Sequence, residues 1–153
     1  MNGDEMRIRE MQGSDYDHLV ALWQDFSGNT MTGADSKEEF NDFLGRNSAY
    51  CFSAFEGERL IGSVMAGNDG RRGYIYHLAV ERSFQNRGIA RMLMEASEDA
   101  LRKDGVEKAH LFIYTDNPAI GFYERTGWHR RTDIAVMSKV LIGDEFMGTR
   151  RDG

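Results

Sequence analysis

The stretch Gln85-Asn86-Arg87-Gly88-Ile89-Ala90 decides the fold, because it joins an apolar run to a long helical pattern. The apolar run Tyr74–Val80 precedes the stretch and predicts a strand. Apolar or small residues then recur at helical spacing: Ile89, Met92, Leu93, Ala96, Ala100 and Leu101. The sequence therefore predicts a strand, a short turn and a helix over Gly88–Lys103, which ends before Gly105.

The turn in this unit has the features of an anion site. Gly88 and Ala90 are small and let a ligand approach the backbone. The first N–H groups of a helix lack internal partners, and the helix dipole adds partial positive charge there. Phosphate is the usual occupant of such a site. A strand that leads into a helix through glycine is also common without any ligand, and the stretch matches neither a dinucleotide fingerprint nor a P-loop.

The remaining patterns predict alternating strands and helices. His110–Thr115 is a short apolar run after the helix, so it should lie parallel to Tyr74–Val80 in a βαβ unit. Upstream, the patterns predict a first strand at Met6–Met11 and a hairpin of Tyr50–Phe55 with Arg59–Ala66. Two helices are predicted between them, one beginning at the capping box Ser14–Asp17 and the other at the capping box Ser36–Glu39. A polar loop, Asn29–Ala34, separates the two helices.

The C-terminal part predicts one more helix and further strands. Asp116 or Asn117 should cap the helix, Pro118 should occupy its first position, and Gly127 should end it. Trp128–Leu141 should hold one or two strands, and Met147–Gly153 should be frayed.

Length and composition indicate one domain over residues 1–153, with a core of about 6–141. The 19 basic and 25 acidic residues give a net charge of −6, which argues against a general nucleic-acid binder and fits a cationic amine substrate. The single cysteine, Cys51, excludes an internal disulfide. The acidic N-terminus lacks the apolar segment of a signal peptide, and no apolar run approaches the roughly 20 residues of a membrane helix. We therefore expect a cytoplasmic protein with no membrane partner.

Two motifs resemble the GNAT superfamily of acyl-CoA-dependent N-acyltransferases. Gln85-x-x-Gly88-x-Ala90 is similar to the signature Q/R-x-x-G-x-G/A of that family, and Asn117–Trp128 is similar to its segment N-x-x-A-x-x-F/L-Y-E-x-x-G-F/W. The turn Gly67–Gly73 is also similar to the corresponding segment of small bacterial members of the YpeA type. The resemblance implies an α/β fold with a mixed, mostly antiparallel sheet of six or seven strands, splayed at strands 4 and 5, with helices on both faces.

The resemblance also implies a site for acetyl-CoA as cosubstrate. The pyrophosphate would lie on the backbone N–H groups of Arg87 to Ala90, and the pantetheine arm would pair with a bulged strand edge at Leu78–Val80. A backbone N–H near Leu78 would hold the thioester oxygen. Arg87 or Arg91 either contacts the phosphates or belongs to a solvated helix face. The implied cofactor-binding residues are Leu78, Ala79, Val80, Gln85, Asn86, Arg87, Gly88, Ile89, Ala90, Asn117, Phe122 and Tyr123.

Tyr123 matches the general-acid tyrosine of the family, although a helix tyrosine packed beside Phe122 would look the same. Asn117 would bond the pantetheine, cap a helix, or do both. The general base stays open. Histidine has an unperturbed pKa of about 6.5, and His77 is a candidate, but alternation groups it with Ile75 and Ala79 and favours a buried structural histidine. The alternatives are a water chain, or a relay through Asp69 or Asp116, and Tyr76 would shape the acceptor pocket.

The implied reaction transfers an acetyl group to a primary amine in a ternary complex, without a covalent acyl-enzyme. The acceptor stays open between a small-molecule amine and the N-terminus or lysine of a peptide or protein. His110 and His129 have no metal-site spacing, so no metal is expected. The alternatives are an acyl-CoA sensor without catalysis, a transferase with another acyl-CoA donor, and an interaction domain that uses only the sheet edge. We expect a monomer or a homodimer.

Overall fold

The computed structural model describes residues 5–26 and 32–143. It divides into two compact units, Met1–Leu111 and Phe112–Gly153, and each is described by itself. The expectation of a single domain over the whole chain therefore stays a prediction. Met147–Gly153 and the first half of the predicted loop Asn29–Ala34, residues 29–31, lie outside the described residues.

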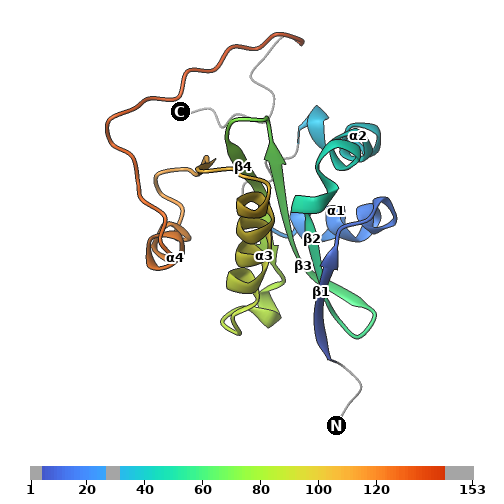
Figure 1. The fold of residues 1–153 in the computed structure, drawn as a ribbon. Helices are drawn as coiled ribbons and strands as arrows, with labels where there is room; N and C mark the ends of the chain where they lie inside the picture. Colours follow the sequence, from blue (N-terminus) through green and yellow to red (C-terminus); the bar gives the residue numbers. More distant parts are fainter. Residues whose placement is uncertain (1–4, 27–31, 144–153) are drawn as a thin grey trace. The chain divides into compact units, whose positions relative to one another are not determined.

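The first unit is built on a mixed sheet (Figure 1). Its strands lie side by side in chain order, and neighbouring strands are antiparallel except for the parallel pair β4 and β5. The described residues contain five strands, so the expectation of six or seven is wrong for this part of the chain. The strands are β1 Met6–Glu10, β2 Phe52–Glu56, β3 Arg59–Asn68, β4 Gly73–Val80 and β5 Ala109–Leu111.

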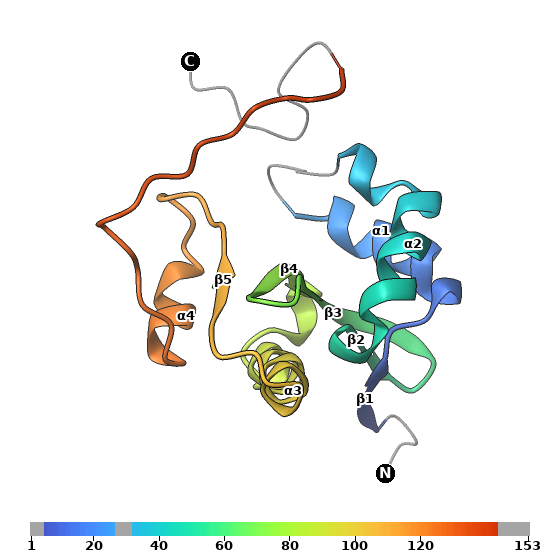
Figure 2. The ribbon, with the colours of Figure 1, turned by 45° about the horizontal axis from the view of Figure 1, so that its top comes forward.

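Helices cover both faces of this sheet, as expected (Figures 1 and 2). Two neighbouring residues of β3 face opposite sides of the sheet. A Cβ on Gly62 would lie 3.1 Å from Leu93 Cδ1, whereas Ser63 accepts a hydrogen bond from Trp23. Leu93 belongs to α3 (Ile89–Lys103) and Trp23 to α1 (Tyr16–Gln24), and α2 (Lys37–Asn47) packs on the same face as α1. The described helices include none that is long and apolar enough to cross a membrane.

The helix ends test the predicted capping residues. The Ser36 side chain accepts a hydrogen bond from Glu39 N at 3.2 Å, and Gly105 follows α3 with φ +85°, so both are confirmed. The predicted box that begins at Ser14 is wrong. Gln12 and Asp15 form a capping box instead, around the short 3-10 helix η1 (Gly13–Asp15) that precedes α1.

A β-bulge interrupts the pairing of β3 with β4. Ser63 pairs with Ala79 and Met65 with Tyr76, so Val64 of β3 faces two residues of β4, His77 and Leu78. His77 has φ +50°, which is uncommon for a residue other than glycine. The extra residue changes the alternation, and His77 lies with Trp23 on the α1 face. Its predicted grouping with Ile75 is therefore wrong, since Ile75 pairs with Ala66 on the α3 side.

The parallel pair is short. Residues Gly73–Ile75 pair with Ala109–Leu111, and no pairing of Tyr76–Val80 with β5 is present in the described part of the chain. β5 ends at Leu111, the partner of Ile75, so the expected splay between strands 4 and 5 stays a prediction. The predicted strand His110–Thr115 is correct only at its start, because β5 ends at Leu111.

The second unit holds one short helix, α4 (Ile120–Arg125). Pro118 is not its first residue, because Ala119 is the N-cap, and the Asn117 side chain accepts a hydrogen bond from Ala119 N at 2.8 Å. Gly127 follows the helix with φ +100°, as expected of a helix end. The segment Trp128–Leu141 contains no strand, so the strands predicted there are wrong, and Met137, Leu141 and Ile142 are exposed.

Candidate functional site

The candidate site of the first unit is the segment that leaves the β4 bulge and enters α3. Glu81 N donates to Ile61 O at 2.8 Å, and Phe84 is buried, so the start of the connection is fixed to the sheet. Gln85 Nε2 donates to Val80 O at 3.0 Å and closes the loop. Asn86 and Gly88 have φ of +65° and +80°, which turns the backbone sharply before α3 begins.

This turn presents a row of backbone N–H groups. Met92 N donates to Gly88 O and starts the helical pattern, so the N–H groups of Ile89 to Arg91 precede the first intrahelical bond. Those of Arg87 and Gly88 have no backbone partner among the described residues. A Cβ on Gly88 would meet nothing within 4 Å, so the backbone angle and the open space beside it, rather than crowding, favour glycine. The arrangement fits an anionic group such as a phosphate.

The two arginines of this region pair with carboxylates. Arg87 Nη1 lies 3.9 Å from Glu56 Oε2, and its guanidinium lies over the Phe84 ring. Arg91 Nε lies 3.3 Å from Glu95 Oε2, one helical turn away. Both arginine side chains are more than half exposed, so these pairs contribute little to stability and leave the cations accessible.

His77 lies in a set of polar and aromatic contacts on the α1 face. Its Nε2 is 2.8 Å from Asp35 Oδ1, and its ring stacks on Trp23 with the centroids 4.0 Å apart. Burial raises the pKa of Asp35, but the hydrogen bond and charge of His77 and the N–H of Thr32 outweigh burial and hold that pKa below its ordinary value. Asp35 is in η2 (Gly33–Asp35), a short 3-10 helix before α2.

The other predicted site residues, Asn117, Phe122 and Tyr123, lie in the second unit. The Tyr123 ring contacts Phe122 and Trp128 edge-on, with centroids 5.2 and 6.2 Å away. Burial raises the pKa of Tyr123 to about 12, so its hydroxyl is protonated at neutral pH. Asn117 stabilises the turn before α4 through its bond from Ala119 N.

Other candidates have structural partners. Asp69 accepts hydrogen bonds from the N–H groups of Arg71 and Arg72 and so stabilises its own turn. Tyr76 contacts Phe43 edge-on. Within residues 5–26 and 32–143, no group of three or more His, Cys, Asp or Glu side chains could hold a metal ion. The absence of a metal nevertheless stays a prediction.

Sequence reasoning missed Asp35, Trp23 and Ser63. They come from three separate elements and meet only at the bulge. Neither helical nor strand periodicity signals a contact of this kind.

The comparisons with known proteins agree with this geometry. The model of the acetyltransferase (GNAT) family matches residues 16–128. An acetyltransferase of Yersinia enterocolitica is 29% identical over 142 residues, which cover 92% of this chain and all of that protein. The narrower YpeA-type resemblance is only loosely supported.

Two solved structures share the fold. An aminoglycoside N-acetyltransferase in complex with CoA has a TM-score of 0.72 at 17% identity and covers 90% of this chain and 97% of its own. The PaiA N-acetyltransferase of Thermoplasma acidophilum in complex with coenzyme A has a TM-score of 0.71 at 18% identity. The match covers 80% of this chain and 89% of that protein. Because the family model spans more than half of the chain, this chain belongs to the acetyltransferase (GNAT) family.

Proposed function

We propose that this acetyltransferase transfers an acetyl group from acetyl-CoA to a primary amine by direct attack in a ternary complex. Acetyl-CoA supplies the acetyl group as a thioester. The observation that carries the proposal is the bulged β4, whose pairing with β5 ends at Ile75 and which leads through the Gly88 turn into α3. The CoA complexes of the two structural neighbours support the choice of cosubstrate.

The phosphate end would bind at the turn. The N–H groups of Arg87, Gly88, Ile89 and Ala90 would donate to the pyrophosphate, since they have no backbone partner among the described residues. Gln85 and Asn86 would shape the turn, the first through its bond to Val80 O and the second through its positive φ. Accessible Arg87 and Arg91 would add charge.

The pantetheine arm would lie along the free part of β4. An amide-containing chain can pair with a strand edge, and Leu78, Ala79 and Val80 follow the point where β5 no longer pairs. The bulge changes the direction of the backbone at Leu78. Its N–H would hold the thioester oxygen as negative charge develops there. The family resemblance assigns Asn117 and Phe122 to cosubstrate binding as well.

Tyr123 would act as the acid at the departing sulfur. Its pKa of about 12 is well above the roughly 8.5 of an ordinary thiol, so the phenol stays protonated. The same difference makes complete proton transfer to a thiolate unfavourable. We therefore assign Tyr123 a hydrogen bond that strengthens as charge develops on sulfur.

Direct attack is supported by the state of the single cysteine. Burial raises the pKa of Cys51 to about 11, so the thiolate needed for a covalent acyl-enzyme is scarce at neutral pH. The acceptor would be a small-molecule amine or the N-terminus or lysine of a peptide. The net charge of −6 favours a cation, and one structural neighbour is an aminoglycoside N-acetyltransferase.

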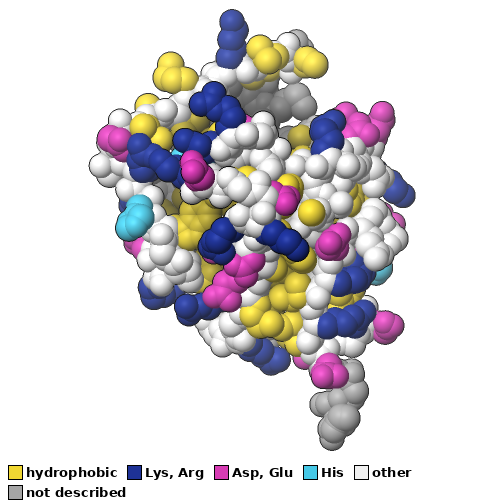
Figure 3. Space-filling model, viewed as in Figure 1, with side chains coloured by type: hydrophobic (Ala, Val, Ile, Leu, Met, Phe, Trp, Pro, Cys, Tyr) yellow, Lys and Arg dark blue, Asp and Glu magenta, His cyan; other side chains and the backbone are white. Residues whose placement is uncertain are grey.

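Acidic and basic side chains intermingle on the face shown in Figure 3. This distribution supports the expectation that nucleic acid is not a partner, because nucleic-acid sites gather basic side chains. The cytoplasmic location and the monomeric or dimeric state are part of the proposal.

Two other functions remain candidates. A sensor would bind acetyl-CoA at the same turn without turnover, and a related transferase would use a longer acyl group. Thiol release from acetyl-CoA and from longer acyl-CoA compounds, measured against a panel of amines and peptide N-termini, separates the three. Turnover that requires an amine supports transfer, whereas binding without turnover on any amine supports the sensor.

The turn itself is tested by thermal stabilisation. Acetyl-CoA should raise the melting temperature, because a ligand that binds only the folded state stabilises it. Gly88→Glu should abolish the shift by placing a negative charge at the phosphates. Gly70→Glu is the matched control, since Gly70 also has a positive φ and open space but lies in the turn before β4. Equal shifts in both folded variants would contradict the site.

The role of Tyr123 is tested by Tyr123→Phe, which removes one hydroxyl. The Kd of acetyl-CoA should stay nearly constant while kcat falls on the order of 10²-fold or more. A kcat within about threefold of wild type would reject Tyr123 as the acid.

A further inference from the structure

The side chains around His77 form a closed set of contacts from three elements. Trp23 Nε1 of α1 donates to Ser63 Oγ of β3 at 2.9 Å, and Ser63 Oγ donates to the carbonyl of His77 at 2.7 Å. The His77 ring then stacks on Trp23, with an angle of 14° between the planes. Both the backbone and the ring of His77 are therefore fixed by the same two neighbours.

The backbone of His77 is held in an uncommon conformation. A φ of +50° is unfavourable in a residue other than glycine and persists only where the surroundings impose it. Residues of this kind cluster at active sites, so an observed outlier justifies a functional hypothesis.

Asp35 fixes the proton arrangement of the ring. Its Oδ2 accepts from Thr32 N at 3.0 Å, and its carbonyl accepts from the Tyr16 hydroxyl at 2.6 Å, so the residue is anchored on two sides. Its lowered pKa keeps the carboxylate ionised at neutral pH. An ionised carboxylate only accepts hydrogen bonds, so Nε2 of His77 carries the proton. Whenever the ring is neutral, its lone pair is therefore on Nδ1.

We propose that Asp35 is a positioning residue that orients His77 as the proton acceptor for the amine, through Nδ1. This inference rests on the proposed function. His77 directly precedes Leu78, whose N–H is assigned to the thioester oxygen, and consecutive Cα atoms are about 3.8 Å apart. The proposed base and the residue that would hold the thioester oxygen are thus consecutive on the same bulge.

The proton transfers balance. The ammonium form of the acceptor gives one proton to Nδ1 of His77. The neutral nitrogen then forms the C–N bond as the C–S bond breaks, and its second proton passes to the departing sulfur. His77 finally returns its proton to solvent. Asp35 is the charged contact of His77 among the described residues, and the contacts from α1 and β3, Trp23 and Ser63, do not titrate.

The kinetic test uses three variants and an acceptor from the amine panel. His77→Asn keeps a side chain that tolerates positive φ, and it should lower kcat roughly 10²–10⁴-fold while the KM of acetyl-CoA is unchanged. Added imidazole should restore part of the activity, and the acid limb of the pH profile of kcat/KM should disappear. Asp35→Asn should lower kcat less, at the same KM. Asp25→Asn, an exposed partner of Arg82, is the control and should match wild type.

A purely structural role for the pair predicts something else. In that case, the variants would lower the melting temperature and leave the pH profile and the imidazole response as in wild type. A kcat of Asp35→Asn and His77→Asn within about threefold of wild type would also overturn the inference.

A second measurement does not depend on turnover. The ¹⁵N spectrum of the His77 ring should show the Nε2-protonated form in wild type and a mixture of tautomers in Asp35→Asn. An Nδ1-protonated ring in wild type would overturn the inference. If wild type turns over no amine, the proposed function fails, and with it the proton transfer. The tautomer then decides separately whether Asp35 orients the ring.

Discussion

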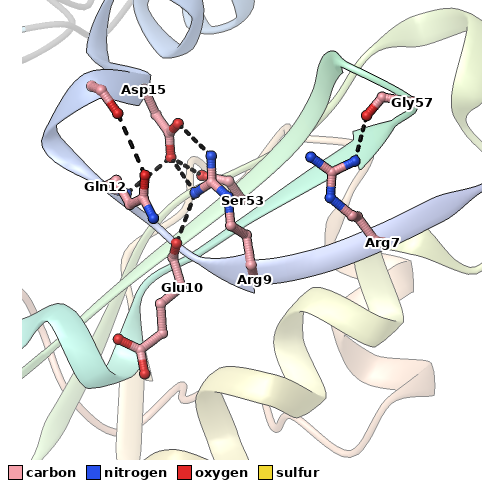
Figure 4. A network of polar contacts seen from close by, with 8 residues as sticks. Arg7, Arg9, Glu10, Gln12, Asp15, Ser53 and Gly57 are labelled. Carbon is pink, nitrogen blue, oxygen red and sulfur yellow. Dashed lines mark hydrogen bonds and ion pairs between the residues drawn. The ribbon is translucent and has the colours of Figure 1, made fainter.

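Replacement of Asp15 by asparagine should destabilise the chain more than its position near a helix start suggests. Asp15 accepts hydrogen bonds from Arg9 Nη2 and Nη1 at 2.8 and 2.9 Å, from Gln12 N at 2.9 Å and from Ser53 Oγ at 2.9 Å (Figure 4). One buried carboxylate thus joins β1, η1 and β2. In Asp15→Asn the amide oxygen can replace only one carboxylate oxygen, and the NH₂ group faces donors.

The magnitude follows from what remains after the change. Removal of one partner of a fully buried ion pair costs about 3–5 kcal/mol because the other charge is left buried. The Arg9 side chain is 32% exposed, so water can solvate part of its charge and reduce that cost. We expect a loss of about 2–3 kcal/mol, which corresponds to a fall in Tm of about 5–10 °C for a chain of this length.

The pH dependence gives a second signature. Burial raises the pKa of Asp15, but the hydrogen bonds from Arg9, Gln12 and Ser53 outweigh it and hold the pKa below the ordinary 3.8. A carboxylate with a lowered folded pKa stabilises the chain fully above the unfolded pKa and loses this contribution as the pH falls through the folded pKa. The stability difference between wild type and Asp15→Asn should therefore be constant above about pH 5 and shrink below about pH 4.

The assay is urea unfolding of both proteins between pH 7 and pH 3. Asp133→Asn is the matched control, because Asp133 also pairs with an arginine through both oxygens but is exposed. The free energy of unfolding of this variant should match wild type. A difference for Asp15→Asn below about 0.5 kcal/mol at pH 7, the range of ordinary surface changes, would mean that the Asp15 carboxylate does not stabilise the chain. A difference that stays constant down to about pH 3 would mean that its ionisation is not linked to folding.

Three further outcomes are expected. Gly62→Ala should cost about 1–3 kcal/mol in urea unfolding, because its Cβ would lie 3.1 Å from Leu93 Cδ1 and 3.3 Å from Ala79 O, and an unchanged stability would mean that the sheet yields. Ser36→Ala should cost about 1 kcal/mol by loss of the bond from Glu39 N, with an unchanged Tm as the contrary result. The net charge of −6 predicts no retardation of DNA at moderate salt in a gel assay, and binding that weakens steeply with salt would oppose it.

The sequence predicted those parts of the fold that depend on local signals. α3 was predictable because its apolar face repeats at helical spacing and Gly105 follows it. The hairpin β2–β3 was predictable from two apolar runs around a tight turn. The turn at Gly88 was predictable from its small residues between a strand and a helix, and the structure adds that Gly88 has a positive φ.

The bulge was not predictable from the residues, because it is a property of two paired strands. His77 carries no signal of its positive φ, and strict alternation placed it with Ile75. Only the family resemblance indicated a bulge. The contact with Asp35 spans 42 residues and joins a 3-10 helix to a strand, so no periodic pattern reveals it.

The errors at the chain ends also have physical causes. The predicted cap paired Ser14 with Asp17, but Asp15 closes a box with Gln12 instead, and Arg9 and Ser53 also bind its carboxylate. Trp128–Leu141 has the β-branched and apolar composition of a strand, yet strand propensity is realised only where a neighbouring strand pairs. The described part of that segment has no such pairing.

The hydrogen bond from Gln85 to Val80 explains which side chains position 85 can accept. The bond needs an N–H donor long enough to reach back five residues to a strand carbonyl. Glutamine and arginine meet both conditions, whereas ionised glutamate would set a negative oxygen against Val80 O. In this chain, the hydrogen bond to Val80 O therefore explains why the first position of the family signature accepts either Gln or Arg. In a library of all twenty residues at position 85, Arg should rank next to Gln, and Glu should fall among the poorest.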